Sequence, residues 1–443
     1  MSVELLSRIQ FAVTVGFHFL FPPVSIGLAW LLALVEWRAW REDSAVYRQM
    51  GRFFGKLLGL TFAAGVVTGI VMEFQFGSNW ARYSRFVGDI FGAPLAAEAI
   101  FAFFLESTFL GLYLLGRGRV SQRTTFVSVV MVAIGATISA FWIIVANSWM
   151  QTPAGYRLTP EGRAELADFW AAVFNPSTML RFGHTLAASL ACGAFFMAGV
   201  GAYILLRNRR DDAPAAAMAR SAVRIGVVAG LVASLLVLYP LGHHHARQVA
   251  RLQPEKFAAI EGLYTSQHRA PLVMFALPYT QPPELKAKVE VPGLLSWMAF
   301  GDVNAHVPGI DQFPPENIPP LWLTFVSFHN MVLLGMFLIA LGAVATVQLR
   351  GGRLFRRRWL LWTLVAAVPA PVAACQFGWV AAEVGRQPWI VYKLMRTADA
   401  FSSNLSPGQV LFSLIAFCVV YLVLGTLYFL ILFRKMHQEA AGH

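Results

Sequence analysis

The feature that most constrains this chain is a series of long apolar stretches. A helix that crosses about 30 Å of hydrocarbon needs roughly 20 consecutive apolar residues. The 443-residue sequence contains nine stretches of this kind, and the first is too long to be a cleaved signal peptide. They run approximately over residues 10–37, 53–76, 93–116, 126–150, 180–206, 221–242, 320–348, 359–384 and 407–433. The sequence therefore predicts an all-α integral membrane protein with about nine transmembrane helices.

The distribution of arginine predicts how these helices are oriented. The net charge is +12, but the basic residues gather in alternate connections between the apolar stretches. These connections are 38–52, 117–123, 207–220 and 350–358. Short arginine-rich loops remain in the cytoplasm, so we expect the N-terminus outside and the C-terminus, with Arg434 and Lys435, inside. The basic excess thus reflects topology and does not indicate a nucleic-acid site.

The domain organisation is simple apart from one long connection. Residues 1–443 are expected to form a single polytopic membrane domain, because no repeat or separate soluble unit is apparent. The segment 243–319 is polar, contains several prolines and lies on the predicted outer side. Connections of that length are usually functional or disordered.

Two acids in the third stretch are out of place in hydrocarbon. Glu98 lies near the predicted outer end, and Glu106, eight residues on, lies about 12 Å deeper if the segment is α-helical. At 100° per residue they would be about 80° apart, on neighbouring sides of one helix. A carboxylate at such depth usually faces a partner, a cavity or a pathway, so these two are expected to line one path.

Other chemically active side chains are predicted at the depth of Glu98. They come from six different spans and are His18, Glu98, Asn147, His184, Met331 and, from the eighth span, Trp379, Glu383 and Arg386. Singly, a histidine or methionine in a span is often core packing, and Trp379 and Arg386 could be interfacial anchors. Together, histidine, methionine and glutamate without cysteine suit haem iron better than zinc or calcium.

Long sequence blocks carry a resemblance to a known family. They are "LSRIQFAVTVGFHFLFPPVSIG", "GVVTGIVMEFQFGSNWARYS", "VGDIFGAPLAAEAIFAFFLES", "WIIVANSWMQTP" and "GRQPW", in that order. The chain resembles subunit I of the cytochrome bd family of quinol oxidases, in the form with the shorter quinol loop. The resemblance covers nearly the whole sequence.

The resemblance implies three haems and their ligands. His184 and Met331 match the axial pair of a low-spin haem b, a ligand set that raises the iron's potential and leaves no open position. His18 and Glu383 match the axial ligands of two high-spin haems, a second haem b and haem d, or a further haem b in place of haem d. Which of the two serves which haem stays open.

Four further residues take roles by the same resemblance. Glu98 lies at the high-spin pair, and Glu106 matches a carboxylate of a proton path. Trp379 would lie between the haems as an electron-transfer or packing residue. Arg386 would pair with a haem propionate.

The resemblance also makes 243–319 an extracytoplasmic quinol-binding loop. Within it, "PEKFAAIEG" supplies Lys256 and Glu261, which five residues apart could lie near one another on a short helix. Lys256 would then hydrogen-bond a quinone oxygen, and Glu261 would accept a proton from quinol. On spacing alone, the pair would instead be a surface ion pair.

Two details depart from the family or stand out in the loop. The family commonly has an arginine two residues before the axial methionine, where "FHNM" places His329. A histidine could still meet a haem propionate, but its charge depends on pH whereas that of arginine does not.

The run "GHHHAR" supplies His243, His244 and His245, but consecutive side chains diverge, so an interfacial polar cap is favoured over a metal site.

The implied function is that of a terminal respiratory oxidase in a bacterial cytoplasmic membrane. It would oxidise quinol at the outer face and reduce O2 to water with cytoplasmic protons, without pumping. Expected partners are subunit II, a small single-span subunit, quinol, O2 and membrane lipids, and no nucleic acid. One rival is a proton-coupled transporter, although transporters usually have repeats and midplane sites. Another is a haem-only electron-transfer subunit, which single ligands such as His18 and Glu383 argue against.

Overall fold

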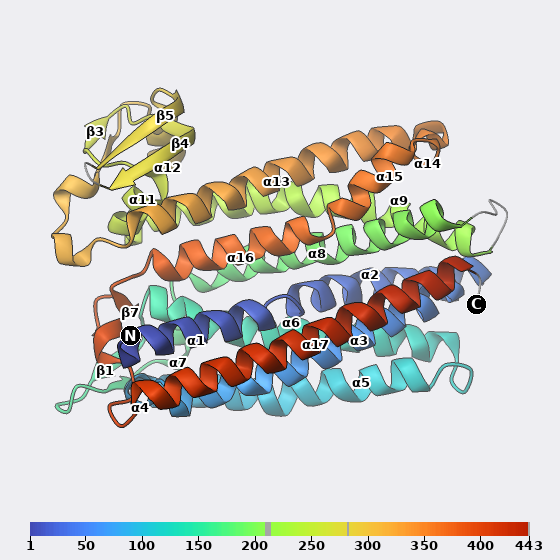
Figure 1. The fold of residues 1–443 in the computed structure, drawn as a ribbon, viewed down its shortest axis with the longest axis horizontal. Coiled ribbons are helices and arrows are strands. Elements are labelled where there is room, and N and C mark those ends of the chain that lie inside the picture. The colour runs from blue at the N-terminus through green and yellow to red at the C-terminus, as the bar shows by residue number, and fades with distance from the viewer. Residues whose placement is uncertain (209–213, 281–282, 442–443) are drawn as a thin grey trace.

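The computed structural model describes residues 1–208, 214–280 and 283–441. Arg209 and Arg210 of the basic connection 207–220 lie outside the described residues. Within those ranges, nine helical spans are long and apolar enough to cross a membrane, and they lie side by side (Figure 1). The spans are Val3–Arg41, Ala45–Ser78, Ala81–Leu115, Gln122–Gln151, Thr178–Arg207, Pro214–Leu252, Leu321–Arg356, Arg358–Val384 and Pro407–Ala441. The predicted helical membrane architecture is confirmed.

Each span consists of one α-helix or of two α-helices in series. These are α1 (Val3–His18), α2 (Pro22–Arg41), α3 (Ala45–Ser78), α4 (Ala81–Ala97), α5 (Phe104–Leu115), α6 (Gln122–Gln151), α8 (Thr178–Arg207), α9 (Pro214–Leu236), α10 (His243–Leu252), α13 (Leu321–Leu349), α14 (Arg353–Arg356), α15 (Arg358–Ala366), α16 (Pro369–Val384) and α17 (Pro407–Ala441). Together they form the elongated bundle of Figure 1, with its two ends at opposite sides of the view.

Proline lies at the breaks in four of the spans, and at the break in the eighth span Pro369 begins α16. Pro22 and Pro23 begin α2 directly after the turn that follows His18. Pro94 in α4 precedes a π-helix over Glu98–Phe103, and Pro240 lies inside a second π-helix over Val237–Gly242. Proline has no N–H to donate and clashes with the preceding turn, so the regular α-helical ladder cannot continue through these positions. The predicted spans are right, but five of them are not uniform α-helices, because the seventh is also broken, at Gly351.

One end of the bundle carries the small β-structures, and we call it the hairpin end. The pairs are β1 (Tyr156–Leu158) with β2 (Ala164–Leu166), β3 (Gln267–His268) with β6 (His306–Val307), β4 (Leu272–Thr280) with β5 (Pro283–Val291), and β7 (Trp389–Val391) with β8 (Met395–Arg396), all antiparallel. The short helices α7 (Phe169–Val173), α11 (Pro254–Glu261) and α12 (Leu294–Phe300) lie there too (Figure 1). The predicted loop 243–319 begins later than expected, because α10 extends the sixth span through Leu252.

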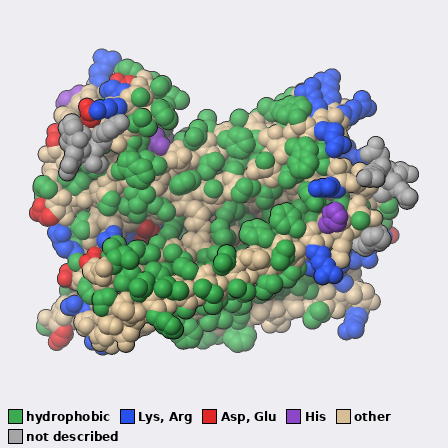
Figure 2. All heavy atoms as spheres, viewed as in Figure 1, with side chains coloured by type: hydrophobic (Ala, Val, Ile, Leu, Met, Phe, Trp, Pro, Cys, Tyr) green, Lys and Arg blue, Asp and Glu red, His purple; other side chains and the backbone are tan. Residues whose placement is uncertain are grey.

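The opposite end is rich in arginine. Figure 2 shows Lys and Arg side chains gathered at that end, mixed charges at the hairpin end, and hydrophobic side chains along the length between them. The exposed hydrophobic residues include Phe412, Leu422 and Phe433 of α17. Such a surface is expected where lipid, and not water, contacts the protein.

The centre of the bundle is packed tightly by glycine. A Cβ atom on Gly27 of α2 would lie 2.0 Å from the Ser189 carbonyl oxygen of α8, and one on Gly193 of α8 would lie 2.3 Å from the Gly27 carbonyl carbon. No larger residue fits at either position, so small residues let the two backbones meet, as is usual between membrane helices. This contact fixes the middle of α8 relative to the first span.

Candidate functional site

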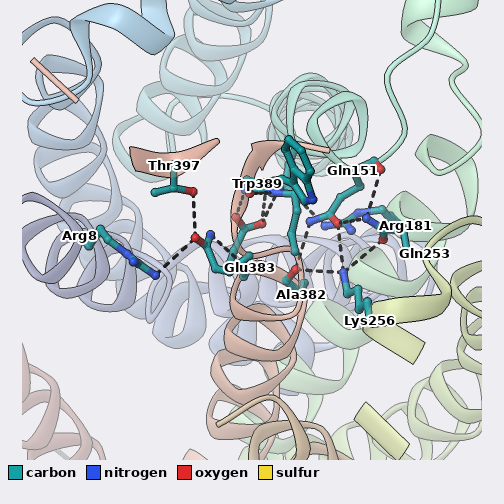
Figure 3. Close-up of polar contacts among 12 residues, drawn as sticks. Arg8, Gln151, Arg181, Gln253, Lys256, Ala382, Glu383, Trp389 and Thr397 are labelled. Atoms are coloured by element: carbon teal, nitrogen blue, oxygen red, sulfur yellow. Dashed lines mark hydrogen bonds and ion pairs between the residues drawn. The ribbon is translucent and has the colours of Figure 1, made fainter. Parts of the chain in front are cut away.

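A polar network lies where α6, α8 and α16 end at the hairpin side. Near the end of α16, Glu383 forms an ion pair with Arg386 and accepts a hydrogen bond from Asn147 Nδ2 of α6 at 2.9 Å (Figure 3). Arg181 of α8 donates to Asn147 Oδ1. Asn147, Glu383 and Arg386 are thus brought together, as the sequence predicts.

Lys256 of α11 joins this network from the other side. Its Nζ lies 3.1 Å from Gln151 Oε1 and 3.0 Å from the carbonyl oxygen of Ala382, the residue before Glu383 (Figure 3). Only 6% of Lys256 is exposed. Burial, followed by the charges of Arg181 and Arg386, holds the pKa of the Lys256 ammonium well below its usual range. Lys256 therefore contacts the end of α16 and the end of α6.

The network has more positive than negative groups. Arg181 and Arg386 are both buried, and Glu383 is the carboxylate they face. Arg181 Nε is buried and has no hydrogen-bond partner in the described part of the chain. A buried N–H of a guanidinium that lacks an acceptor is unfavourable, so this place suits an anionic group. Sequence reasoning did not single out Arg181, because an arginine at the start of a span is usually an interfacial anchor.

His184 lies on α8 one turn beyond Arg181, facing the π-helix of the sixth span. Its Nδ1 atom is buried and has no hydrogen-bond partner among the described residues. The ring centroid of His245 lies 5.7 Å away, and a Cβ atom on Gly242 would lie 3.6 Å from His184 Cε1. The imidazole of His184 therefore packs beside the π-helix Val237–Gly242, which contains Pro240.

Met331 lies on α13 against α16, the helix that carries Glu383. A Cβ atom on Gly378 would lie 2.8 Å from Met331 Sδ, so a residue larger than glycine at position 378 would clash with the thioether. Trp379, the next residue of α16, is partly buried. The neighbourhood of Met331 is thus set by α16.

His18 is the last residue of α1 and is oriented by Thr68 of α3. The Thr68 hydroxyl donates to the Ala64 carbonyl at 2.8 Å and lies 3.0 Å from His18 Nδ1. With the hydroxyl proton on the backbone carbonyl, the hydroxyl oxygen can accept from Nδ1–H, and in that tautomer the Nε2 lone pair is free. A hydrogen-bond acceptor at Nδ1 is what holds a metal-binding histidine in its correct tautomer.

Glu98 and Glu106 both face α6. Ser139 Oγ donates to Glu98 Oε1 at 2.7 Å, and a Cβ atom on Gly135 would lie 3.0 Å from Glu106 Cβ. Gly135 and Ser139 are one turn, or about 6 Å, apart on the same side of α6. The expected separation of 80° assumed a regular α-helix, whereas residues Glu98–Phe103 form a π-helix. Both acids nevertheless line one face.

Glu261 lies apart from this network, in a cavity at the hairpin end. The cavity has a volume of about 370 Å³ and is lined by Glu261, Tyr264, Val273, Leu285 and Lys288, among others. Only 5% of Glu261 is exposed, and its Oε2 atom has no hydrogen-bond partner in the described part of the chain. Burial raises the pKa of the Glu261 carboxyl to about 8.

The structure does not bring Lys256 and Glu261 into one cavity. Both are buried on α11, as the expected short helix requires, but Lys256 does not line the cavity that contains Glu261. Five residues correspond to about 140° of rotation on an α-helix, so the two side chains point to different sides of α11.

The comparison with known sequences agrees with this arrangement. Residues 6–440 match the family described as cytochrome bd terminal oxidase subunit I. The chain belongs to this family. It is 41% identical to the cytochrome bd ubiquinol oxidase subunit 1 of Bacillus subtilis (strain 168), over 99% of this chain and 95% of that protein. It is also 36% identical to the cytochrome bd-II ubiquinol oxidase subunit 1 of Escherichia coli (strain K12), over 94% and 93%.

A solved structure of the family has the same fold. The bd oxidase from Geobacillus thermodenitrificans superposes with a TM-score of 0.91 at 30% sequence identity, covering 98% of both chains. As a cytochrome bd subunit I, the chain is a multi-pass protein of the bacterial cytoplasmic membrane and part of a respiratory terminal oxidase. Membership implies haem cofactors and a subunit II partner.

The residues described above fit haem. The free Nε2 of His18, the unpartnered Nδ1 of His184 and the thioether of Met331 are side chains that can serve iron. The unpartnered Nε of Arg181 and the guanidinium of Arg386 suit propionates. Glu383 is the exception, since its carboxylate already has Arg386 and Asn147 as partners and would have to share them with iron.

Proposed function

We propose that this chain oxidises quinol at the hairpin end and reduces O2 to water there, with that end outside the membrane. The observation that carries the proposal is the buried Glu261 Oε2 atom in the cavity of about 370 Å³, which has no hydrogen-bond partner among the described residues. A quinol hydroxyl would supply the missing partner. The arginine-rich loops at the other end support its assignment to the cytoplasm, and the N-terminus would then be outside and the C-terminus inside.

His184 and Met331 would hold the low-spin haem b, and His18 and Glu383 the two high-spin haems, a haem b and a haem d or further haem b. When bound, these groups supply electron transfer and, at open coordination positions, oxygen reduction. Arg181 and Arg386 would neutralise propionates. By accepting a hydrogen bond from His18 Nδ1–H, Thr68 would leave the Nε2 lone pair of His18 free for iron. Trp379 would pack between the cofactors.

Glu261 would act as the base for quinol. A carboxyl with a pKa of about 8 is deprotonated often enough near neutral pH to accept a hydroxyl proton, and basic enough to hold it. The proton would then leave to the outer surface. The predicted hydrogen bond from Lys256 to a quinone oxygen would require its Nζ to leave Gln151 and the Ala382 carbonyl.

Protons for water would travel along α6. Glu106 and Glu98 belong to the third span and contact one face of α6. They would carry protons in that order from the cytoplasmic side towards the hairpin end. Because quinol protons leave on one side and oxygen's protons come from the other, charge is separated without pumping. A subunit II and a small single-span subunit would complete the enzyme, and ubiquinol or menaquinol would be its donor.

Replacing Glu261 tests the quinol site. In purified holoenzyme, Glu261→Gln should lower quinol oxidation by roughly 100-fold, the usual contribution of a general base. Reduction of the haems by dithionite should be unchanged, because that reagent does not use the cavity. Undiminished quinol oxidation by the variant would place the site elsewhere.

A further inference from the structure

His329 is held between two backbone carbonyl groups. It lies in α13, two residues before Met331. Its Nδ1 is 3.0 Å from the carbonyl oxygen of Phe325 in its own helix, and its Nε2 is 3.0 Å from the carbonyl oxygen of Val273 in β4. Both ring nitrogens are thus directed at backbone oxygens; a neutral imidazole has one N–H and donates to one of the two, whereas an imidazolium donates to both. The ring is therefore engaged by α13 and β4, and not by a haem propionate, which a histidine at this position could have met.

The contact through Nε2 reaches the wall of the Glu261 cavity. Val273 lines that cavity, as does Leu285 of the facing strand β5. Strand β4 belongs to a sheet of only two strands, and its register with β5 shifts between Val273 and Phe275. A two-stranded hairpin is marginally stable alone, so its position depends on what it rests on.

The same part of α13 also contacts the segment that carries Glu261. Phe325 stacks on the His329 ring, with centroids 3.8 Å apart. A Cβ atom on Gly262 would lie only 2.9 Å from Phe325 Cδ2, so Phe325 closes against the end of α11. Phe325, Val273 and Ala276 form one buried cluster. His329 and Phe325 thus join α13 to both sides of the cavity.

We propose that His329 is a positioning residue for the quinol cavity, fastening the β4 wall to α13 through the Val273 carbonyl. It would contact neither quinol nor haem. This inference rests on the proposed function for the statement that the cavity takes quinol; the fastening itself rests on the contacts alone. Its consequence is that quinol affinity, rather than the environment of the Met331 haem, depends on the side chain at 329.

Two substitutions separate the two ring nitrogens. A glutamine amide nitrogen reaches about as far as Nε2, so His329→Gln can still donate to Val273. An asparagine amide reaches only as far as Nδ1, so His329→Asn can keep the contact with Phe325 but not the one with β4. Both variants remain polar and similar in bulk, which makes them a matched pair.

The experiment uses purified holoenzyme with intact subunits and measures hydrogen exchange in β4–β5, quinol kinetics and the reduced-minus-oxidised spectrum. His329→Asn should speed exchange in Leu272–Val291 and raise the KM for a soluble quinol about five-fold, the effect of losing one hydrogen bond. It should leave kcat and the low-spin haem spectrum unchanged. His329→Gln should behave like the wild type in all three measurements.

Two results would overturn the inference. One is wild-type exchange and KM in His329→Asn. The other is a shifted low-spin spectrum in both variants with normal exchange, which would return His329 to a propionate. Failure of the quinol assignment is distinguishable: Glu261→Gln would then oxidise quinol normally, while faster hairpin exchange in His329→Asn would still show the fastening.

Discussion

At the scale of single residues, several side chains at the hairpin end are arranged for a partner that protein atoms do not supply. Arg181 Nε, His184 Nδ1 and Glu261 Oε2 are buried and have no hydrogen-bond partner among the described residues. Buried polar atoms are nearly always paired in folded proteins, and each exception calls for an explanation. In the proposed function, a haem propionate, haem iron and quinol would provide one for each.

Thr68 offers a test of how His18 is oriented. Thr68→Val keeps the shape of the side chain but removes the oxygen that accepts from Nδ1–H, so His18 loses the contact that fixes its tautomer. Loss of a second-shell partner typically costs ten- to a hundred-fold in affinity, and we expect high-spin haem content to fall accordingly on dilution in detergent. Thr68→Ser retains the hydroxyl and should keep its haem.

Glu261 predicts a pH dependence of quinol oxidation. The carboxyl must be deprotonated to accept a proton, and its pKa is raised to about 8. Below that pH the deprotonated fraction rises about ten-fold per unit, and above it the fraction levels off. The value of kcat/KM for quinol should therefore climb between about pH 6 and pH 8. A profile in Glu261→Gln that keeps this rising limb would assign it to another group.

At the scale of elements, the sequence predicted the spans well and their interior geometry poorly. Hydropathy is a local property, so nine spans could be found without knowing how they pack. The consequences of Pro94 and Pro240 were missed, because an isolated proline in a membrane helix can kink it, open a π-turn or do neither. The fastening of His329 to β4 could not be predicted either, since it depends on where a separate hairpin packs.

Glu98 and Glu106 of the third span pack against α6, and this leads to a prediction for proton delivery. Glu106→Gln keeps the shape of a side chain that packs against Gly135 but cannot release a proton at neutral pH. We expect oxygen consumption to fall at least ten-fold, a modest part of what a positioned proton-transfer group provides, with haem content unchanged. Ser107→Ala is the control, because that hydroxyl donates only to its own helix, to Phe103 and Phe104. Equal turnover in the two variants would exclude a proton role for Glu106.

At the scale of the whole molecule, the two ends of the bundle differ in charge, and this asymmetry predicts how the protein is oriented in the membrane. Arg119 lies exposed at the arginine-rich end and Glu161 at the hairpin end. The three native cysteines, Cys192, Cys375 and Cys418, are within spans. In intact cells, a membrane-impermeant thiol reagent should label Glu161→Cys and spare Arg119→Cys until the membrane is opened. The reverse pattern would invert the proposed topology.

The most direct test of the central claim is the reduced-minus-oxidised spectrum of the purified oxidase carrying Met331→Ala, compared with Met336→Ala. Met336 lies on the same helix but is 48% exposed on its outer surface. If helices α8 and α13 present His184 and Met331 to one low-spin haem, Met331→Ala should abolish the low-spin signal, and so should His184→Ala, while Met336→Ala retains it. A full low-spin signal in Met331→Ala and His184→Ala would contradict the account.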